Sequence, residues 1–120
     1  LKKGRFHGPR LNGIVVPGGG DCALVRPDGV LEADVRLLLR CDDEAYIYMT
    51  YRGLWHAEAD VFQRLLRREA GIGEDQYYFR TAIFFETGHP KYEWLNRILA
   101  VGIGTPVPES AASVRYRTYE

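Results

Sequence analysis

Residues 77–86 read YYFRTAIFFE, and this run decides the fold class. Aromatic and β-branched residues dominate it, and neither glycine nor proline interrupts it, which is typical of a β-strand. Because side chains alternate between the two faces of a strand, Arg80 and Glu86 fall on one face together with Tyr78, while Ile83 falls on the other. A strand that only packs does not need this arginine and carboxylate, so we expect their face to carry chemistry.

Further β-rich runs lie on both sides of this strand, separated by Gly, Pro and Asp-Gly. Their near-regular spacing predicts an antiparallel sandwich or barrel. The expected strands cover residues 11–16, 21–26, 31–41, 45–52, 77–87, 94–103 and 113–119. One helix is expected at residues 57–70, where the apolar residues are one-sided. Its narrow apolar stripe predicts that it covers an end or a wall of the sheet.

Length and composition restrict the possible functions. The chain has 120 residues, which fit one domain, and its 46% apolar and 27% charged content is that of a globular protein. Sixteen basic residues balance sixteen acidic ones, so neither nucleic acid nor an anionic membrane is expected as the main partner. The chain contains no run of 18 apolar residues, so no membrane-spanning helix is predicted.

The chain starts at Leu1 rather than at a methionine, and no signal peptide opens it. Together with the odd number of expected strands, this predicts that an N-terminal strand is missing. We expect a cytoplasmic location. No Cys-x-x-Cys or His-x-x-x-His spacing occurs, so no metal is expected. The glycine run at residues 17–20 lacks the lysine and helix of a phosphate-binding loop, and no cofactor is expected.

The Asp28-Gly29 turn sets an expected register for the hairpin around it. A turn of two or four residues places Cys22 opposite Val35 and Asp21 opposite Arg36. The register keeps Cys22 far from Cys41, which predicts two free thiols and a reducing compartment. Asp21 then either forms a surface ion pair with Arg36 or orients Arg36 toward an anionic or carbonyl oxygen.

The next hairpin is expected to turn at Asp43-Glu44. A two-residue turn places Leu39 opposite Tyr48 and puts an apolar face inside. The interior would then also contain Tyr46, Tyr48, Thr50 and Arg52. Several interior tyrosine hydroxyls indicate either a ligand cavity or core tyrosines with satisfied hydrogen bonds.

The sequence does not determine the register of the hairpin after residues 77–87. An odd-length loop over residues 88–92 pairs Glu86 with Trp94 and Phe84 with Asn96, which gives Trp94 and Asn96 the face of Arg80. A shift of one residue moves both to the opposite face. Arg80 and Glu86 could also form an ion pair with a purely structural role.

Several motifs together resemble a known family, and they cover nearly the whole chain. They are residues 4–13 (GRFHGPRLNG), 17–21 (PGGGD), 26–29 (RPDG), 77–81 (YYFRT), 85–88 (FETG) and 92–96 (YEWLN). In this order they resemble the bacterial and fungal domain-of-unknown-function 3237 family. The resemblance implies a mainly β, antiparallel up-and-down barrel of the calycin type, similar in outline to lipocalins, with one helix. It also implies further residues at the N-terminus.

The chain departs from the family pattern in two places. Cys22 stands where an aromatic residue is common, and Glu44 stands where a turn glycine is common. Some relatives appear beside genes for aromatic-compound or natural-product metabolism, which suggests a small organic ligand but no defined activity.

Two functions of different classes follow from these residues. The first is a cofactor-independent isomerase, cyclase or lyase acting on a small carbonyl-bearing aromatic or polyketide-like molecule inside the barrel. Arg80 or Arg36 would stabilise an oxyanion, and Glu86 and Tyr48 would move a proton. The expected substrate contacts are Arg36, Trp94, Asn96, Tyr78 and Asp21. The alternative is a barrel that binds a small molecule without chemistry. The sequence leaves open whether copies form a homo-oligomer.

Overall fold

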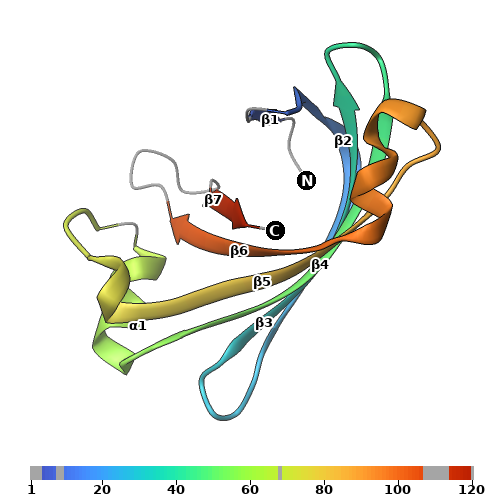
Figure 1. The fold of residues 1–120 in the computed structure, drawn as a ribbon. Coiled ribbons are helices and arrows are strands. Elements are labelled where there is room, and N and C mark those ends of the chain that lie inside the picture. Colours follow the sequence, from blue (N-terminus) through green and yellow to red (C-terminus); the bar gives the residue numbers. More distant parts are fainter. Residues whose placement is uncertain (1–3, 8–9, 68, 107–113, 120) are drawn as a thin grey trace.

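The computed structural model describes residues 4–7, 10–67, 69–106 and 114–119. Within these residues, seven antiparallel strands form one sheet in sequence order, which is the expected up-and-down arrangement. Figure 1 shows the sheet curling around a concave side. The strands are β1 (Gly4–His7), β2 (Asn12–Val25), β3 (Leu31–Cys41), β4 (Tyr46–Ala57), β5 (Tyr77–Glu86), β6 (Leu99–Pro106) and β7 (Val114–Tyr119).

Strand β2 joins two strands that the sequence predicted separately. The pairing with β3 is interrupted between Val16 and Gly20, where β2 contains a bulge. Gly18 has φ of 104°, a backbone conformation that glycine adopts readily. The glycines that were expected to form a loop therefore form a β-bulge within one continuous strand. Strand β1 was not predicted.

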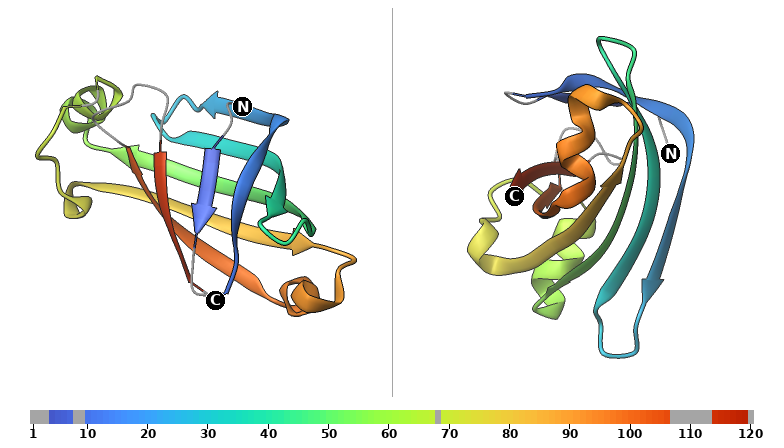
Figure 2. Two further views of the ribbon diagram at one scale, coloured as in Figure 1. Left: turned by 90° about the horizontal axis from the view of Figure 1, so that it is seen from above. Right: turned by 45° about the vertical axis from the view of Figure 1, so that its right-hand side comes forward.

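Short helices lie at opposite ends of the sheet (Figures 1 and 2). Helix α1 (Ala59–Leu66) lies inside the expected range of 57–70 and follows β4 directly. Two 3₁₀ helices, η1 (Glu74–Gln76) and η2 (Pro90–Arg97), come before and after β5. The predicted antiparallel barrel class with one α-helix is confirmed.

Both predicted hairpin registers are wrong by one residue, for the same physical reason. Each loop has three residues, whereas two or four were expected in the first hairpin and two in the second. The third residue of each loop has positive φ: 88° at Gly29 and 70° at Glu44. A turn followed by a left-handed residue is the common three-residue hairpin loop. Asp21 consequently lies opposite Val35, and Leu39 lies opposite Ile47.

A shift of one residue exchanges the faces of a strand. Ile47 and Tyr51 of β4 are buried, whereas Tyr46, Tyr48 and Arg52 are exposed and Thr50 is half-buried. The predicted interior of Tyr46, Tyr48, Thr50 and Arg52 is therefore the outer face. The inner side chains of β4 are Ile47, Met49, Tyr51 and Trp55.

The hairpin after β5 also differs from the prediction. Residues 90–97 form η2, so Trp94 and Asn96 are not strand residues. The side chain of Asn96 holds the backbone of Thr87 at both ends: Oδ1 accepts from the Thr87 N–H at 2.8 Å, and Nδ2 donates to the Thr87 carbonyl at 2.8 Å. Proline at the start of η2 fits a helical first turn, where its missing N–H costs nothing.

A second set of contacts fastens η2 to the β3–β4 loop. Asp43 Oδ2 accepts hydrogen bonds from Lys91 Nζ at 2.9 Å and from the Tyr92 hydroxyl at 2.8 Å. These contacts lower the pKa of Asp43 to about 2, with the Lys91 hydrogen bond as the main cause. Burial raises the pKa of Tyr92. The charged loop and the helix are thereby joined across the end of the sheet.

The core consists of two apolar clusters on the concave side. One lies under η2 and includes Ile47, Val35 and Leu95, and the other lies under α1 and includes Trp55, Phe79 and Leu65. A row of small residues separates them, with Ala33, Gly53, Thr81 and Gly102 directly opposite one another across four strands. A Cβ on Gly102 would lie 2.3 Å from Thr81 Oγ1, so this row needs its small side chains.

Candidate functional site

One cleft lies at the α1 end of the described structure, between the helix and the tip of the β2–β3 hairpin. It is open on one side and encloses about 1000 Å³. Apolar, aromatic and acidic side chains line it. These residues are Val25, Asp28, Gly29, His56, Ala57, Glu58, Ala59, Val61, Phe62, Gln63, Leu66, Asp75, Gln76, Tyr77 and Tyr78.

Helix α1 forms the apolar wall of this α1 cleft. Leu65 is buried against the sheet, and Phe62 packs on Trp55 with ring centroids 5.1 Å apart. The next residue, Leu66, is 47% exposed and lines the cleft. One helical turn thus both packs on the core and presents a leucine to the α1 cleft. This arrangement follows from the one-sided apolar pattern of residues 59–66.

Aromatic rings form a second wall. His56 and Tyr78 are cross-strand partners on the outer face, and their rings stack with centroids 5.1 Å apart and an interplanar angle of 18°. The guanidinium of Arg80 lies over the Tyr78 ring, 5.2 Å from its centroid. Tyr78 therefore has an imidazole and a guanidinium close to its ring and presents a fixed edge to the α1 cleft.

The charges of the α1 cleft are acidic. Asp28, Glu58 and Asp75 line it, and among the described residues that line it there is no lysine or arginine. Arg26 neutralises one of these carboxylates: its Nε donates to Asp28 Oδ1 at 3.1 Å, and this pairing lowers the pKa of Asp28. A neutral or cationic ligand fits this wall better than an anion.

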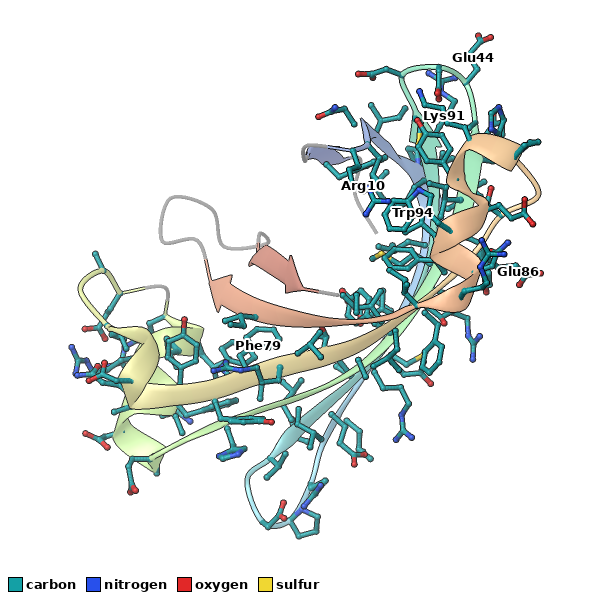
Figure 3. All side chains as sticks on the ribbon, viewed as in Figure 1. Arg10, Glu44, Phe79, Glu86, Lys91 and Trp94 are labelled. Carbon is teal, nitrogen blue, oxygen red and sulfur yellow. The ribbon has the colours of Figure 1, made fainter. Side chains whose placement is uncertain are left out.

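The predicted catalytic pair does not converge. Arg80 and Glu86 both lie on the outer face of β5, where Glu86 is exposed and Arg80 half-buried. Six residues along a strand span about 20 Å, so the two side chains cannot contact one another. Figure 3 shows Glu86 directed away from the concave side that Phe79 faces. The structural ion pair considered from the sequence is excluded by the same distance.

Arg36 and Tyr48, two other predicted residues, do gather with Glu86 on the outer face. Arg36 and Tyr48 line one cleft of about 320 Å³, and Glu86 lies directly opposite Tyr48. A hydrogen bond to Tyr48 is the largest cause of the raised pKa of Arg36. The remaining wall of this cleft is the β2 bulge at residues 17–20. We call it the bulge cleft.

The other predicted contact residues are dispersed. Asp21 pairs with Val35 and therefore lies on the face opposite to that of Arg36, so it cannot orient this arginine. Trp94 lies on the concave side, with the Arg10 guanidinium 3.5 Å from its ring centroid (Figure 3). The side chain of Asn96 forms two hydrogen bonds with the backbone of Thr87. Of the eight predicted site residues, Tyr78 alone lines the α1 cleft.

Sequence reasoning missed most of the α1 cleft. Leu66 and Phe62 belong to the apolar side of the predicted helix at residues 57–70, which was interpreted only as a packing surface, and His56 was not among the predicted site residues. An available signal was the direct junction of an aromatic strand end with a short amphipathic helix. The contribution of Val25 and Asp28 depends on how far the β2–β3 hairpin reaches, which the sequence does not encode locally.

Three further results concern metals, membranes and thiols. Within the described residues, no three His, Cys, Asp or Glu side chains gather so that they could hold a metal ion. No helix in the described part of the chain is long and apolar enough to cross a membrane. Cys22 is exposed and Cys41 buried, and both are free, which confirms the predicted absence of a disulfide between them.

Comparison with known proteins agrees with the fold. The chain is 35% identical over 114 residues to a UPF0311 protein of Clostridium acetobutylicum, covering 95% of this chain and 72% of that protein. It is 34% identical over 99 residues to a UPF0311 protein of Rhodopseudomonas palustris, covering 82% of this chain and 64% of that one. The chain thus spans slightly less than two thirds of the second relative.

Solved structures show the same likeness. A beta-barrel like protein from Acinetobacter baumannii matches with a TM-score of 0.79 and 34% identity, over 98% of this chain and 73% of that one. A conserved protein of unknown function from Rhodopseudomonas palustris matches with a TM-score of 0.80 and 32% identity, over 88% of this chain and 70% of that one. The model of the family "Protein of unknown function (DUF3237)" matches residues 1–120, and the chain belongs to this family.

Proposed function

We propose that this protein binds a small, planar organic molecule in the α1 cleft without transforming it. The observation that carries the proposal is the cleft itself: about 1000 Å³, with an apolar helix on one side and stacked rings on the other. Ligand sites of small molecules are typically of this size, mostly apolar, and contain a few polar groups. His56, Glu58 and Gln63 are polar groups that could orient such a ligand.

The placement of Arg80 and Glu86 favours binding over catalysis. Acid–base catalysis needs both groups within reach of one substrate, and a site shielded from water makes their charges effective. About 20 Å of strand separates Arg80 from Glu86, and Glu86 is exposed. The free thiols of Cys22 and Cys41 suit a reducing compartment, and we propose the cytoplasm as the location.

The first test is binding of N-phenyl-1-naphthylamine, a neutral aromatic dye that fluoresces in apolar sites. We expect saturable binding to the wild type. Leu66→Gln should weaken it roughly fivefold, because the dye loses apolar contact. The matched control is Leu24→Gln, since Leu24 is also a surface leucine, 59% exposed, but does not line the cleft.

Equal affinities of the Leu66→Gln and Leu24→Gln variants would show that the dye binds elsewhere and would refute the α1 cleft as the site. Glu86→Gln should leave dye binding unchanged, because Glu86 does not line this cleft. A loss of binding in Glu86→Gln would favour a site on the outer face instead.

A further inference from the structure

The bulge cleft lies on the outer face of β3 and β4, separate from the α1 cleft. It encloses about 320 Å³ between the β2 bulge and the side chains of Arg36 and Tyr48. Because Arg36 and Tyr48 come from neighbouring strands, the sheet fixes their spacing. The volume suits a small molecule or one charged group of a larger one.

The two polar side chains that line this cleft, Arg36 and Tyr48, can both donate hydrogen bonds. A guanidinium carries five N–H donors and no acceptor, and its planar shape matches carboxylate and phosphate oxygens. Tyr48 adds a hydroxyl close enough to interact with Arg36. Both side chains are exposed, so a ligand can reach them without a rearrangement.

Gly20 gives the strongest indication that the space in front of Arg36 is kept open. It lies directly opposite Arg36 in the β2–β3 pairing, so a side chain there would stand beside the guanidinium. Unlike Gly18, Gly20 does not have positive φ, and a Cβ built on it meets no atom within 4 Å. Neither backbone conformation nor packing therefore requires a glycine at this position, although glycine weakens a strand.

Charges around the cleft leave Arg36 available. Asp34 is two residues away on the same face, where its charge adds to the effect of Tyr48 in raising the pKa of Arg36, and it lies directly opposite Arg52. Glu86 lies on β5, opposite Tyr48 and one strand further from Arg36. Among the described residues, Arg36 forms no ion pair within 4 Å.

We propose that the bulge cleft binds an oxyanion, the carboxylate or phosphate group of a small molecule, through the Arg36 guanidinium and the Tyr48 hydroxyl, with Gly20 keeping the approach open. Charge-assisted hydrogen bonds of this kind are the strong ones, and a bidentate arrangement adds directional preference.

The test is an NMR titration that follows the backbone amides of Gly18, Gly19 and Gly20 at constant ionic strength. One arm adds sodium phosphate, a second adds sodium acetate, and a third adds acetamide as the neutral analogue of acetate. We expect saturable shifts with phosphate, acetate or both, and none with acetamide. The arm with the higher affinity identifies which oxyanion the site prefers.

Three variants test whether the anion binds in the bulge cleft. Arg36→Met should weaken binding about tenfold or more, because it removes the charged donor. Gly20→Val should block binding while the thermal unfolding midpoint stays equal or rises, since valine fits a strand at this position. Arg40→Met is the matched control: Arg40 is exposed on the same face of β3 but does not line the cleft, and its loss should leave the affinity unchanged.

Two results would overturn the proposal. One is a linear, unsaturable response of the wild type to both anions. The other is an equal loss of affinity in Arg36→Met and Arg40→Met, which would mean that general positive charge attracts the anion. If Gly20→Val fails to fold, the comparison of Arg36→Met with Arg40→Met still decides between these outcomes.

Discussion

Two buried threonines, Thr81 within β5 and Thr87 just after its end, contribute to the fold in different ways. Thr87 Oγ1 donates to the Tyr46 carbonyl at 2.7 Å and accepts from the His89 N–H at 3.2 Å. Thr81, only 3% exposed, has a hydroxyl without a hydrogen-bond partner among the described residues, and it packs against Gly102. One hydroxyl joins segments of the chain, while the other mainly fills space.

Replacing each threonine with valine should therefore have different effects. Thr87→Val should lower the free energy of unfolding by about 1–3 kcal/mol, because it removes two part-buried hydrogen bonds, to the Tyr46 carbonyl and from the His89 N–H. Thr81→Val should leave it unchanged or raise it by up to about 1 kcal/mol, because no hydrogen bond is lost. Urea denaturation of both variants measures the difference. A large loss in Thr81→Val would show that its hydroxyl has a partner.

At the scale of elements, the two hairpin loops determine which side chains face the concave side. Both have three residues, and both end in a left-handed residue, Gly29 in one and Glu44 in the other. The glycine expected in such a loop is present in the first and absent in the second. Glu44 therefore adopts a backbone conformation that an L-residue reaches only at a cost.

Opposite substitutions in these two loops should have opposite effects. Glu44→Gly should raise the free energy of unfolding by about 0.5–1 kcal/mol, because it removes this cost. Gly29→Ala should lower it by about 1 kcal/mol, and no clash confounds the result, since a Cβ at Gly29 meets nothing within 4 Å. Thermal and urea unfolding test both. Destabilisation by Glu44→Gly would mean that the Glu44 side chain contributes more than its backbone costs.

The contact between the β3–β4 loop and η2 should make stability depend on pH. Folding lowers the pKa of Asp43 from an ordinary value of 3.8 to about 2 through Lys91 and Tyr92. The unfolded chain therefore binds a proton at Asp43 more readily than the folded one. The stabilisation from this carboxylate is fully present above about pH 4 and is lost as the pH falls toward 2.

Thermal unfolding at several pH values between 5 and 2 measures this contribution. Asp43→Asn should lower the midpoint at pH 5 and should make it fall less steeply below pH 4 than in the wild type. Asp42→Asn, at the neighbouring exposed carboxylate, is the control and should keep the wild-type slope. An unchanged slope in Asp43→Asn would show that other carboxylates determine the acid sensitivity.

At the scale of the whole molecule, the strand pattern of residues 77–86 and the turn glycines were enough to predict an antiparallel sandwich or barrel with one helix. The up-and-down arrangement was expected only from the family resemblance. The position of that helix was also correct, because its apolar side chains recur with helical spacing. Which side chains face inward on β4 could not be predicted, because it depends on whether a loop has two or three residues. In the β3–β4 loop the left-handed position is usually a glycine, and because Glu44 occupies it, the sequence did not indicate a three-residue loop.

The candidate sites were harder to predict than the fold for a related reason. Alternation along one strand correctly placed Arg80 and Glu86 on the same face, but sharing a face says nothing about distance along it. Arg36 and Tyr48 do meet, through a β3–β4 pairing that shifted by one residue from the expected register. The α1 cleft combines segments near residues 28, 58 and 76, and no local pattern records that proximity.

The order of the strands has a consequence for how the chain reaches this structure. Every strand pairing in the described part of the chain joins strands that are consecutive in sequence. Each hairpin can form before the next one, so only short stretches of backbone have to close at each step, apart from the longer connection between β4 and β5. Among all-β proteins of similar length, those with distant pairings, such as Greek keys, pay a larger entropic cost before any contact forms. This chain should therefore fold faster than such proteins and could begin while its last strands are still being synthesised.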